Sequence, residues 1–299
     1  SVVDSRINLR IDPDTRAPRT DELSVGVDRE VGRRLAVAVA YVRKDGANFI
    51  GWTDTAGQYR PETRTLSDGR SVPVFVLDTA VTPTSARRFL LTNPDGYSLT
   101  YNGLVMVAEK RAHGWQAFGS YTYSRASGLQ PSSGTTAAGP QVSTVGPPGN
   151  LTFGRDPNDL TNARGLLPND RPHIFRAMGS VDIPRTGFVF AADLQRFSGK
   201  PWAATTQVLL PQGDTRLMLE PRGSRRLSSQ SLLDLRVSRT FALGGAGRVE
   251  LLLDLLNALD DTAEEGLATD NFFSPNFGRP IAFVDPRRAM ISARLNLGR

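Results

Sequence analysis

Residues capable of chemistry are few and scattered in this chain. His113 and His173 are the only histidines among 299 residues, and there is no cysteine. Disulfides and thiolate metal sites are therefore excluded, and multi-histidine metal sites are disfavoured. His173 follows Asp170 by three residues, so a histidine–carboxylate pair could activate a nucleophile there. Because Pro172 directly precedes His173, we interpret this histidine as the start of a strand, and we expect no enzyme activity. We expect His113 to be a solvated turn residue.

An acidic run near the C-terminus offers oxygen ligands of the kind that Ca²⁺ prefers. It consists of Asp254, Asp260, Asp261, Glu264 and Glu265. The run lacks the spacing and the central glycine of an EF-hand loop. We therefore expect a solvated loop, with loop-bound calcium as the alternative.

The glycine-rich segment 244–247 predicts a hairpin turn, because no helix follows it to complete a phosphate-binding loop. Neither a Gly-x-Ser-x-Gly nor a Walker motif is present. The sequence therefore predicts no cofactor, and it identifies no catalytic, metal-binding or cofactor-binding residue.

The net charge of +6 comes mostly from scattered arginines, with lysine only at positions 44, 110 and 200. Scattering of the charge argues against a nucleic-acid partner. The longest apolar stretch, 251–259, contains Asp254, so no transmembrane helix is expected. The chain begins Ser-Val-Val-Asp without an initiator Met, which we interpret as a mature product or a fragment.

Apolar and polar residues alternate with period two along much of the chain, which predicts strands. Ten segments show the pattern: 7–11, 23–27, 35–41, 97–107, 115–123, 175–181, 188–194, 233–237, 249–255 and 289–297. In the fourth segment, Tyr97, Leu99, Tyr101, Val105 and Val107 are assigned to the apolar face.

Short and long connections alternate between these segments. The tight ones are 31–34, 111–114, 184–187 and 242–248, and the long polar ones are 12–19, 45–96, 125–169, 203–228 and 260–286. Segment 126–150 is rich in Ser, Gly, Thr and Pro and predicts a mobile loop. Strict alternation is typical of a transmembrane barrel with short periplasmic turns and long extracellular loops. With ten strands, the first strand would begin and the last strand would end on the periplasmic side.

The positions of aromatic residues favour a membrane barrel over a soluble sandwich. Trp115 and Tyr123 share a strand face and lie roughly 20 Å apart along a tilted strand, close to the height of the apolar band. Tyr97, Tyr101 and Trp202 are placed at the long-loop ends of their strands. Polar residues expected to line the interior are Asp28, Gln116, Arg176, Asp193, Asp234 and Arg236.

Several stretches resemble the C-terminal barrel of TonB-dependent receptors, in the Oar-like group with a carboxypeptidase-regulatory-like domain. They are residues 17–44, YNGLVMVAEKRAHGWQAFGSYTYSRA at 101–126, NDRPHIFRAMGSVDIP at 169–184, SGKPW at 198–202, LLDLRVSRTF at 232–241, VELLLDLLNALD at 249–260 and DPRRAMISARLNLGR at 285–299. The chain departs from the family by ending in Leu297-Gly298-Arg299 instead of an aromatic residue, so either a few residues are missing or the assembly signal is atypical.

The resemblance implies an all-β, antiparallel barrel of about 22 strands around a plug, located in the bacterial outer membrane. Residues 1–299 would form the C-terminal part of that barrel, without the plug and signal peptide. It would import a large nutrient, such as a siderophore, glycan or peptide, that binds at the extracellular loops. Implied partners are the lipid bilayer and, through the absent N-terminal region, the TonB complex. Two alternatives stay open: a complete small barrel acting as an adhesin or rim hydrolase, and a soluble β-sandwich binding module.

Overall fold

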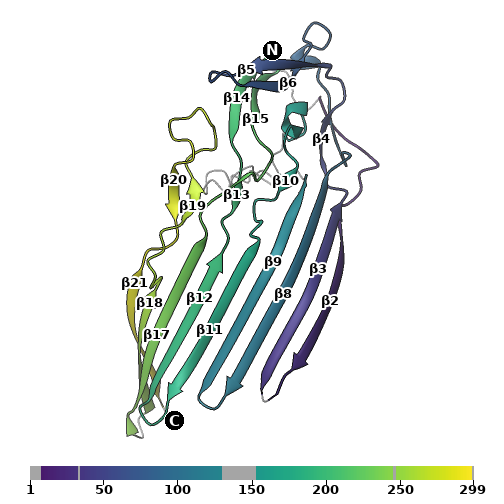
Figure 1. Cartoon of the computed structure of the whole chain (residues 1–299). Helices are drawn as coiled ribbons and strands as arrows, with labels where there is room; N and C mark the ends of the chain where they lie inside the picture. Colours follow the sequence, from purple (N-terminus) through teal and green to yellow (C-terminus); the bar gives the residue numbers. More distant parts are fainter. Residues whose placement is uncertain (1–7, 33, 130–152, 245–246, 298–299) are drawn as a thin grey trace.

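The chain forms one long antiparallel sheet with smaller sheets above one of its ends (Figure 1). The computed structural model describes residues 8–32, 34–129, 153–244 and 247–297. The predicted mobile segment 126–150 therefore falls largely outside the described residues. The main strands are β2 (Arg19–Glu30), β3 (Leu35–Ala47), β8 (Ser98–Ala112), β9 (Trp115–Leu129), β11 (His173–Ile183), β12 (Phe188–Phe197), β17 (Gln230–Ala242), β18 (Gly247–Leu256) and β21 (Arg288–Leu297).

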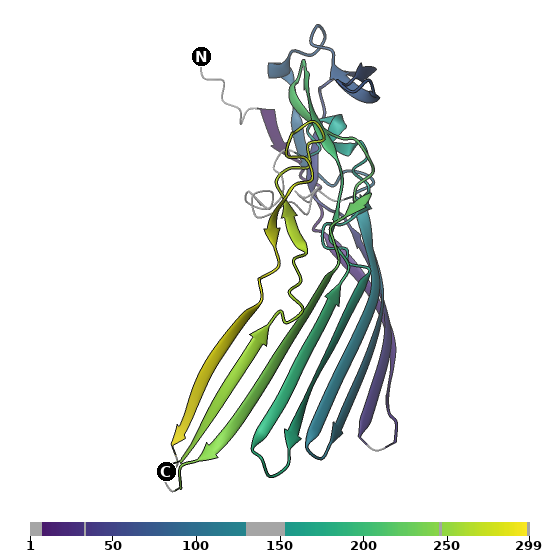
Figure 2. The same cartoon turned by 60° about the vertical axis from the view of Figure 1, so that its left-hand side comes forward.

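These strands follow one another in the sheet in chain order, each antiparallel to the next. The two-residue β10 (Gly165–Leu166) also pairs with β9. Within the described residues β2 and β21 are the two ends of the sheet and do not pair with each other. The sheet is thus part of an up-and-down barrel with two open edges, as Figure 2 shows.

All four predicted tight connections are hairpin turns at one end of the sheet, here called the turn end. In the shortest, His113 and Gly114 join Ala112 to its partner Trp115. Gly114 has φ +78°, a left-handed conformation that glycine adopts without steric cost. The predicted alternation of short and long connections is therefore confirmed.

The first predicted strand does not belong to the barrel. Its residues form the short β1 (Leu9–Ile11), which pairs in parallel with β7 (Phe89–Thr92) in a separate three-stranded sheet with β4 (Gly51–Asp54). The main sheet therefore begins with β2, which starts beside the long loops. This corrects the expectation that the first strand starts at the turn end. With nine sequential antiparallel strands, the start of the first strand and the end of the last lie at opposite ends of the barrel wall.

The two faces of the sheet differ in polarity. On β18, Leu251 and Leu253 are 47% and 49% exposed, whereas the alternate residues Leu252 and Asp254 are 8% and 7% exposed. Register connects Leu253 with Val237 of β17 and Ile291 of β21, and Asp254 with Arg236. We call the first side the outer face and the second the inner face. Exposed apolar side chains on one face, with charged side chains on the other, are typical of a membrane barrel and exclude a soluble sandwich.

Strand β8 is oriented differently from the prediction. Pairing with β3 and β9 places Val105 and Val107 on the inner face, beside Thr122 and Ser120. Leu104 and Met106 lie on the outer face instead. Every residue from 104 to 108 is apolar, so alternation within this strand alone could not show which set faces outward.

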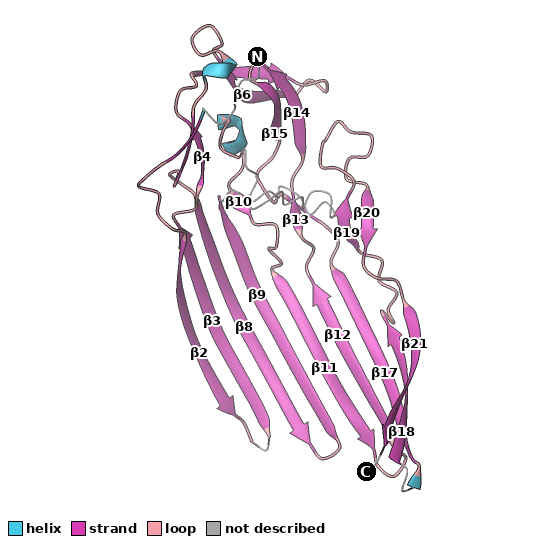
Figure 3. Ribbon diagram, turned by 180° about the vertical axis from the view of Figure 1, so that it is seen from behind, coloured by secondary structure: helices cyan, strands magenta, loops and turns pink. Residues whose placement is uncertain are grey.

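Long connections fold into compact hairpins at the opposite end, the loop end (Figure 3). These are β5 (Tyr59–Thr65) with β6 (Ser71–Leu77), β14 (Thr205–Leu210) with β15 (Gly213–Met218), β13 (Pro201–Trp202) with β16 (Arg225–Arg226), and β19 (Glu264–Leu267) with β20 (Pro280–Phe283). Short 3₁₀ helices among the described residues include η2 (Thr84–Ala86) and η3 (Pro157–Leu160). No described helix is long and apolar enough to cross a membrane.

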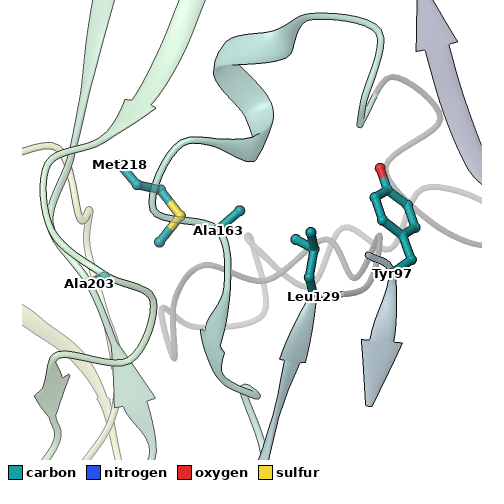
Figure 4. Packing of buried hydrophobic residues seen from close by; sticks show 5 residues of the cluster. All are labelled: Tyr97, Leu129, Ala163, Ala203 and Met218. Carbon is teal, nitrogen blue, oxygen red and sulfur yellow. The ribbon is translucent and has the colours of Figure 1, made fainter. Parts of the chain in front are cut away.

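The buried hydrophobic clusters of the described residues lie among these loops and not within the barrel wall. One contains Tyr97, Leu129, Ala163, Ala203 and Met218 (Figure 4). A second joins Val74 and Val76 of β6 to Leu210 and Leu217 of the β14–β15 hairpin. The third surrounds Trp202, which is therefore a loop-core residue and not part of a membrane-facing aromatic belt. Because they have cores of their own, the described loops form a folded cap.

Candidate functional site

Two regions could handle a solute: the inner face of the sheet and the cap at its loop end. A hollow of about 670 Å³ lies on the inner face, across strands β8 to β18. Its polar lining includes Glu109, Arg111, Gln116, Ser180, Asp193, Asp234, Arg236 and Asp254. Such a surface suits water and hydrated groups far better than lipid chains.

Ion pairing on this face is incomplete. Arg236 donates to Asp254 from Nε at 2.5 Å and from a terminal nitrogen at 3.1 Å, which is the bidentate geometry of a strong pair. Asp193 accepts a bond from Gln195 at 3.1 Å, and its other oxygen is buried with no partner among the described residues. Asp234 accepts the backbone N–H of Asn257 at 2.8 Å. The inner face thus keeps hydrogen-bonding capacity for a further group.

The structure brings the six predicted interior residues to one side of the sheet. Asp28, Gln116, Arg176, Asp193, Asp234 and Arg236 all have registers that place them on the inner face. Sequence reasoning did not find Glu109 and Asp254 as neighbours of this set. Glu109 was missed because the sequence analysis assigned the odd-numbered residues of β8 to the apolar face, whereas the structure places them on the inner face.

An aromatic and arginine cluster lies on the cap. Trp202, Phe277, Phe272 and Phe273 contact in series, with ring centroids 5.6, 5.1 and 5.3 Å apart. The Arg225 guanidinium lies 5.2 Å from the Trp202 ring centroid, and that of Arg70 lies 4.2 Å from Phe272. Phe273 is exposed at the end of the series. Rings and guanidinium groups in this arrangement offer stacking and cation–π contacts to a flat or ring-shaped ligand.

A second cluster anchors the loops near β7. The Arg87 guanidinium donates to Asp54 at 2.8 Å, and both side chains are nearly buried. Arg155 lies 4.3 Å from the Trp52 ring centroid and 5.2 Å from that of Phe89. Burial, with the nearby Arg87 charge, lowers the pKa of Arg155. This packing is structural, because these groups are enclosed by the cap.

Buried polar groups continue around η3. Asp159 accepts the backbone N–H of Gly154 at 2.9 Å. Burial raises the pKa of Asp159 to about 6, and the charge of Asp156 contributes in the same direction. Tyr97 is buried close by, and burial raises its pKa too. A carboxyl group that titrates close to neutral pH therefore lies inside the cap.

The acidic run is dispersed as anchoring contacts. Glu265 accepts bonds from Lys200 at 2.5 Å and from Gln230, and Arg171 lies 3.6 Å away. Asp260 pairs with Arg287 at 3.1 Å, and Asp261 accepts backbone N–H groups. Among the described residues, no group of three or more His, Cys, Asp or Glu side chains could hold a metal ion.

His173 does not contact Asp170. Its Nδ1 lies 2.7 Å from the Tyr121 hydroxyl, and its ring lies 5.2 Å from that of Tyr123, so it belongs to an exposed group on the outer face. Asp170 instead pairs with Arg226 and accepts the Ala126 N–H. His113 is exposed in its hairpin turn, as expected.

Comparison with known proteins agrees with this architecture. Residues 6–214 match the model of a family described as an outer membrane beta barrel domain. A search of curated proteins finds no match. Among solved structures, the outer membrane transporter YddB from Escherichia coli has a TM-score of 0.54 at 13% identity, covering 94% of this chain and 33% of that one.

Two further structures are similar. The ferric-catecholate import receptor Fiu from Escherichia coli K12 has a TM-score of 0.51 at 12% identity, covering 94% of this chain and 28% of that one. The ferripyoverdine receptor of Pseudomonas aeruginosa has a TM-score of 0.50 at 13% identity, covering 93% of this chain and 27% of that one. The chain therefore spans about a third or less of the length of these structures.

The fold and its exposed apolar face define an integral protein of the bacterial outer membrane. The family match covers more than half of the chain, so the chain belongs to the outer membrane β-barrel domain family.

Proposed function

We propose that this chain is the C-terminal part of the barrel of a TonB-dependent outer-membrane receptor that imports a large nutrient. The main support is the open sheet, whose outer face carries exposed apolar side chains and whose inner face carries polar and charged ones. Edge strands β2 and β21 are exposed along their whole length, and such edges invite pairing with further strands. A larger barrel would supply those strands and leave room for a plug.

The proposed orientation places the turn end in the periplasm and the loop end outside the cell, since short turns and long loops are arranged in this way in bacterial barrels. Nutrient capture would then fall to the cap, where loops on a rigid scaffold present side chains for recognition. The series from Trp202 to Phe273, with Arg70 and Arg225, is its most developed binding surface.

For the substrate, we infer a ring-containing nutrient, such as a siderophore or a glycan, because aromatic rings and guanidinium groups stack on such ligands. Two structural relatives are a ferric-catecholate import receptor and a ferripyoverdine receptor, which supports the siderophore choice. The stretches at 101–126 and 169–184 support placing the chain in the Oar-like group.

Barrel closure tests the fragment proposal directly. Expressed alone in outer membranes, the chain should give no heat-resistant monomer on gel electrophoresis, because two edges stay unpaired. Coexpression with the coding sequence upstream of Ser1 should restore one. A heat-resistant monomer from residues 1–299 alone would contradict the proposal and support a complete small barrel.

Transport is tested by growth on single iron or carbon sources in strains with and without TonB. We expect TonB-dependent growth that is lost when both Phe272 and Phe273 are replaced by Ala. Matched replacement of Phe283, an exposed residue of the same connection outside the aromatic series, should leave growth intact. Growth that is independent of TonB would overturn the transport proposal.

A further inference from the structure

Charged residues on the outer face are distributed very unevenly. From β8 to β21, register places five basic side chains on this face: Lys110, Arg125, His173, Arg196 and Arg239. None of the outward-facing residues of these described strands is acidic. The inner face carries both signs, so the bias belongs to the lipid-facing surface alone.

The neighbouring strands β2 and β3 show the contrast. Two of their three outward-facing arginines are paired with a carboxylate, Arg19 with Asp21 at 3.6 Å and Arg43 with Asp45 at 2.7 Å, whereas the third, Arg29, has no ion pair among the described residues. Arg125 and Arg196 have no ion-pair partner among the described residues and are exposed. Their positive charge is therefore not neutralised within the described part of the chain.

The five basic residues lie at two levels. Lys110 and Arg239 are close to the turn end, where Arg239 packs 4.8 Å from the ring centroids of Phe188 and Phe241. Arg125, His173 and Arg196 are close to the loop end. Between the two levels the outer face is apolar. Two levels separated by an apolar band match the two surfaces of a bilayer.

The loop-end residues occupy adjacent strands. His173 of β11 lies opposite Tyr123 of β9, and Arg125 follows two positions later on the same face. Arg196 of β12 lies opposite Phe175, two positions after His173. Each arginine is thus a diagonal neighbour of His173, at about 7–8 Å between backbones, within reach of long side chains.

Tyrosines orient the central histidine. The Tyr121 ring stacks on His173 with centroids 6.1 Å apart, and its hydroxyl lies 2.7 Å from Nδ1. When that hydroxyl donates to Nδ1, the ring proton is on Nε2, where it can donate to an anion. Tyr123 lies beside the ring and is exposed. Tyrosine at the height of lipid headgroups is typical of membrane proteins.

We propose that Arg125, His173 and Arg196 bind the phosphorylated headgroup of a lipid in the outer leaflet, whose acyl chains then lie along the apolar face below. Guanidinium groups match the oxygens of a phosphate, and within the described part of the chain neither arginine has a carboxylate partner that would compete. The proposal rests on the orientation given under the proposed function, because only that orientation places these residues in the outer leaflet.

The test is direct lipid binding by the heat-resistant barrel that coexpression with the upstream coding sequence gives, purified in dodecyl maltoside. Native mass spectrometry would measure binding of bisphosphorylated lipid A, phosphate-free lipid A and phosphatidylglycerol. We compare the wild type with the double variant Arg125→Gln/Arg196→Gln. The control is Lys110→Gln/Arg239→Gln, which removes the same charge at the turn end.

The expected result is at least about tenfold weaker binding of bisphosphorylated lipid A by the loop-end variant, with little change in the control, since a charge-assisted hydrogen bond contributes on this scale. Wild-type binding of phosphate-free lipid A should be weak. Equal binding by wild type and loop-end variant would overturn the site, as would equal binding of phosphatidylglycerol and lipid A. Loss of lipid A binding in the turn-end variant alone would overturn both the site and the orientation. TonB-dependent growth tests the transport proposal independently.

Discussion

Asp193 of β12 lies directly opposite Asp234 of β17 on the inner face of the sheet. Like charges in directly opposed positions destabilise a pair of strands. Only Asp234 is compensated by a backbone N–H, and one Asp193 oxygen has no partner among the described residues. The neighbouring Arg236 is already paired with Asp254. Repulsion between these two carboxylates therefore destabilises the inner face, at a position that would face the interior of a larger barrel.

Replacing Asp193 by Asn should therefore stabilise the isolated wall by about 0.2–1 kcal/mol. Replacing Asp254 by Asn should have the opposite effect, because it removes the carboxylate that pairs with Arg236, at a cost of about 1–3 kcal/mol. Urea unfolding of the barrel in detergent micelles measures both. A lower unfolding midpoint for Asp193→Asn would show that a group outside this chain already compensates Asp193.

Substitutions at neighbouring positions in the middle of β21 test the assignment of the faces. Ala293 pairs with Leu251 on the outer face, and Ser292 pairs with Leu252 on the inner face. Ala293→Arg should cost about 2–4 kcal/mol in a bilayer, because it brings a charge into the hydrocarbon core. Ser292→Arg, which faces the interior, should cost far less. Equal costs, measured by unfolding in lipid vesicles, would contradict the assignment of outer and inner faces.

Asn158 joins η3 to β6 within the cap and is only 1% exposed. Its side chain accepts the Phe75 N–H and donates to the Phe75 carbonyl, both at 2.8 Å. Asn158→Ala leaves these backbone groups unpaired, so we expect a local loss of about 1–3 kcal/mol. Hydrogen exchange at the Phe75 amide should accelerate accordingly. The control is Asn276→Ala, at an exposed turn position, where exchange at Phe75 should not change.

Attachment of the 257–287 loop should weaken in acid. Burial raises the pKa of Glu265, but hydrogen bonds from Lys200 and Gln230, with the charges of Lys200 and Arg171, outweigh burial and lower it below its usual value. The stabilisation is therefore present above the ordinary pKa of 4.5 and is lost as the pH falls through the lowered pKa. In limited proteolysis, the 257–287 loop of Glu265→Gln should be cleaved faster than that of the wild type at pH 7. At a pH below the lowered pKa of Glu265, the two should be cleaved equally fast.

The segment around Asp159 should respond in the opposite direction. Its pKa is raised from 3.8 to about 6, so the folded segment binds more protons than the unfolded one between those values. Stability should therefore increase as the pH falls from 7 through 6 toward 4. Asp159→Asn should be insensitive to pH in this range. Proteolysis of residues 153–167, compared between wild type and variant at each pH, measures the difference, and a wild type without pH dependence would count against it.

Period-two alternation and tight turns were sufficient to locate most of the barrel wall from the sequence. Apart from Tyr97, which precedes β8, the segments from 23–27 to 289–297 lie within sheet strands, and the hairpin turns at 31–34 and 111–114 fall where they were predicted. The reason is local: alternation and glycine turns act over a few residues, so they can be recognised without knowledge of partners.

Three features depended on the tertiary structure. Residues 7–11 alternate like a barrel strand, but β1 pairs with β7, which is remote in sequence. The faces of β8 follow from its pairing with β3 and β9, because residues 104–108 are apolar on both sides. Arg125, His173 and Arg196 are distant in sequence and become neighbours only through the register of β9, β11 and β12. Pairing between strands is a non-local interaction, and it decides which side chains share a surface.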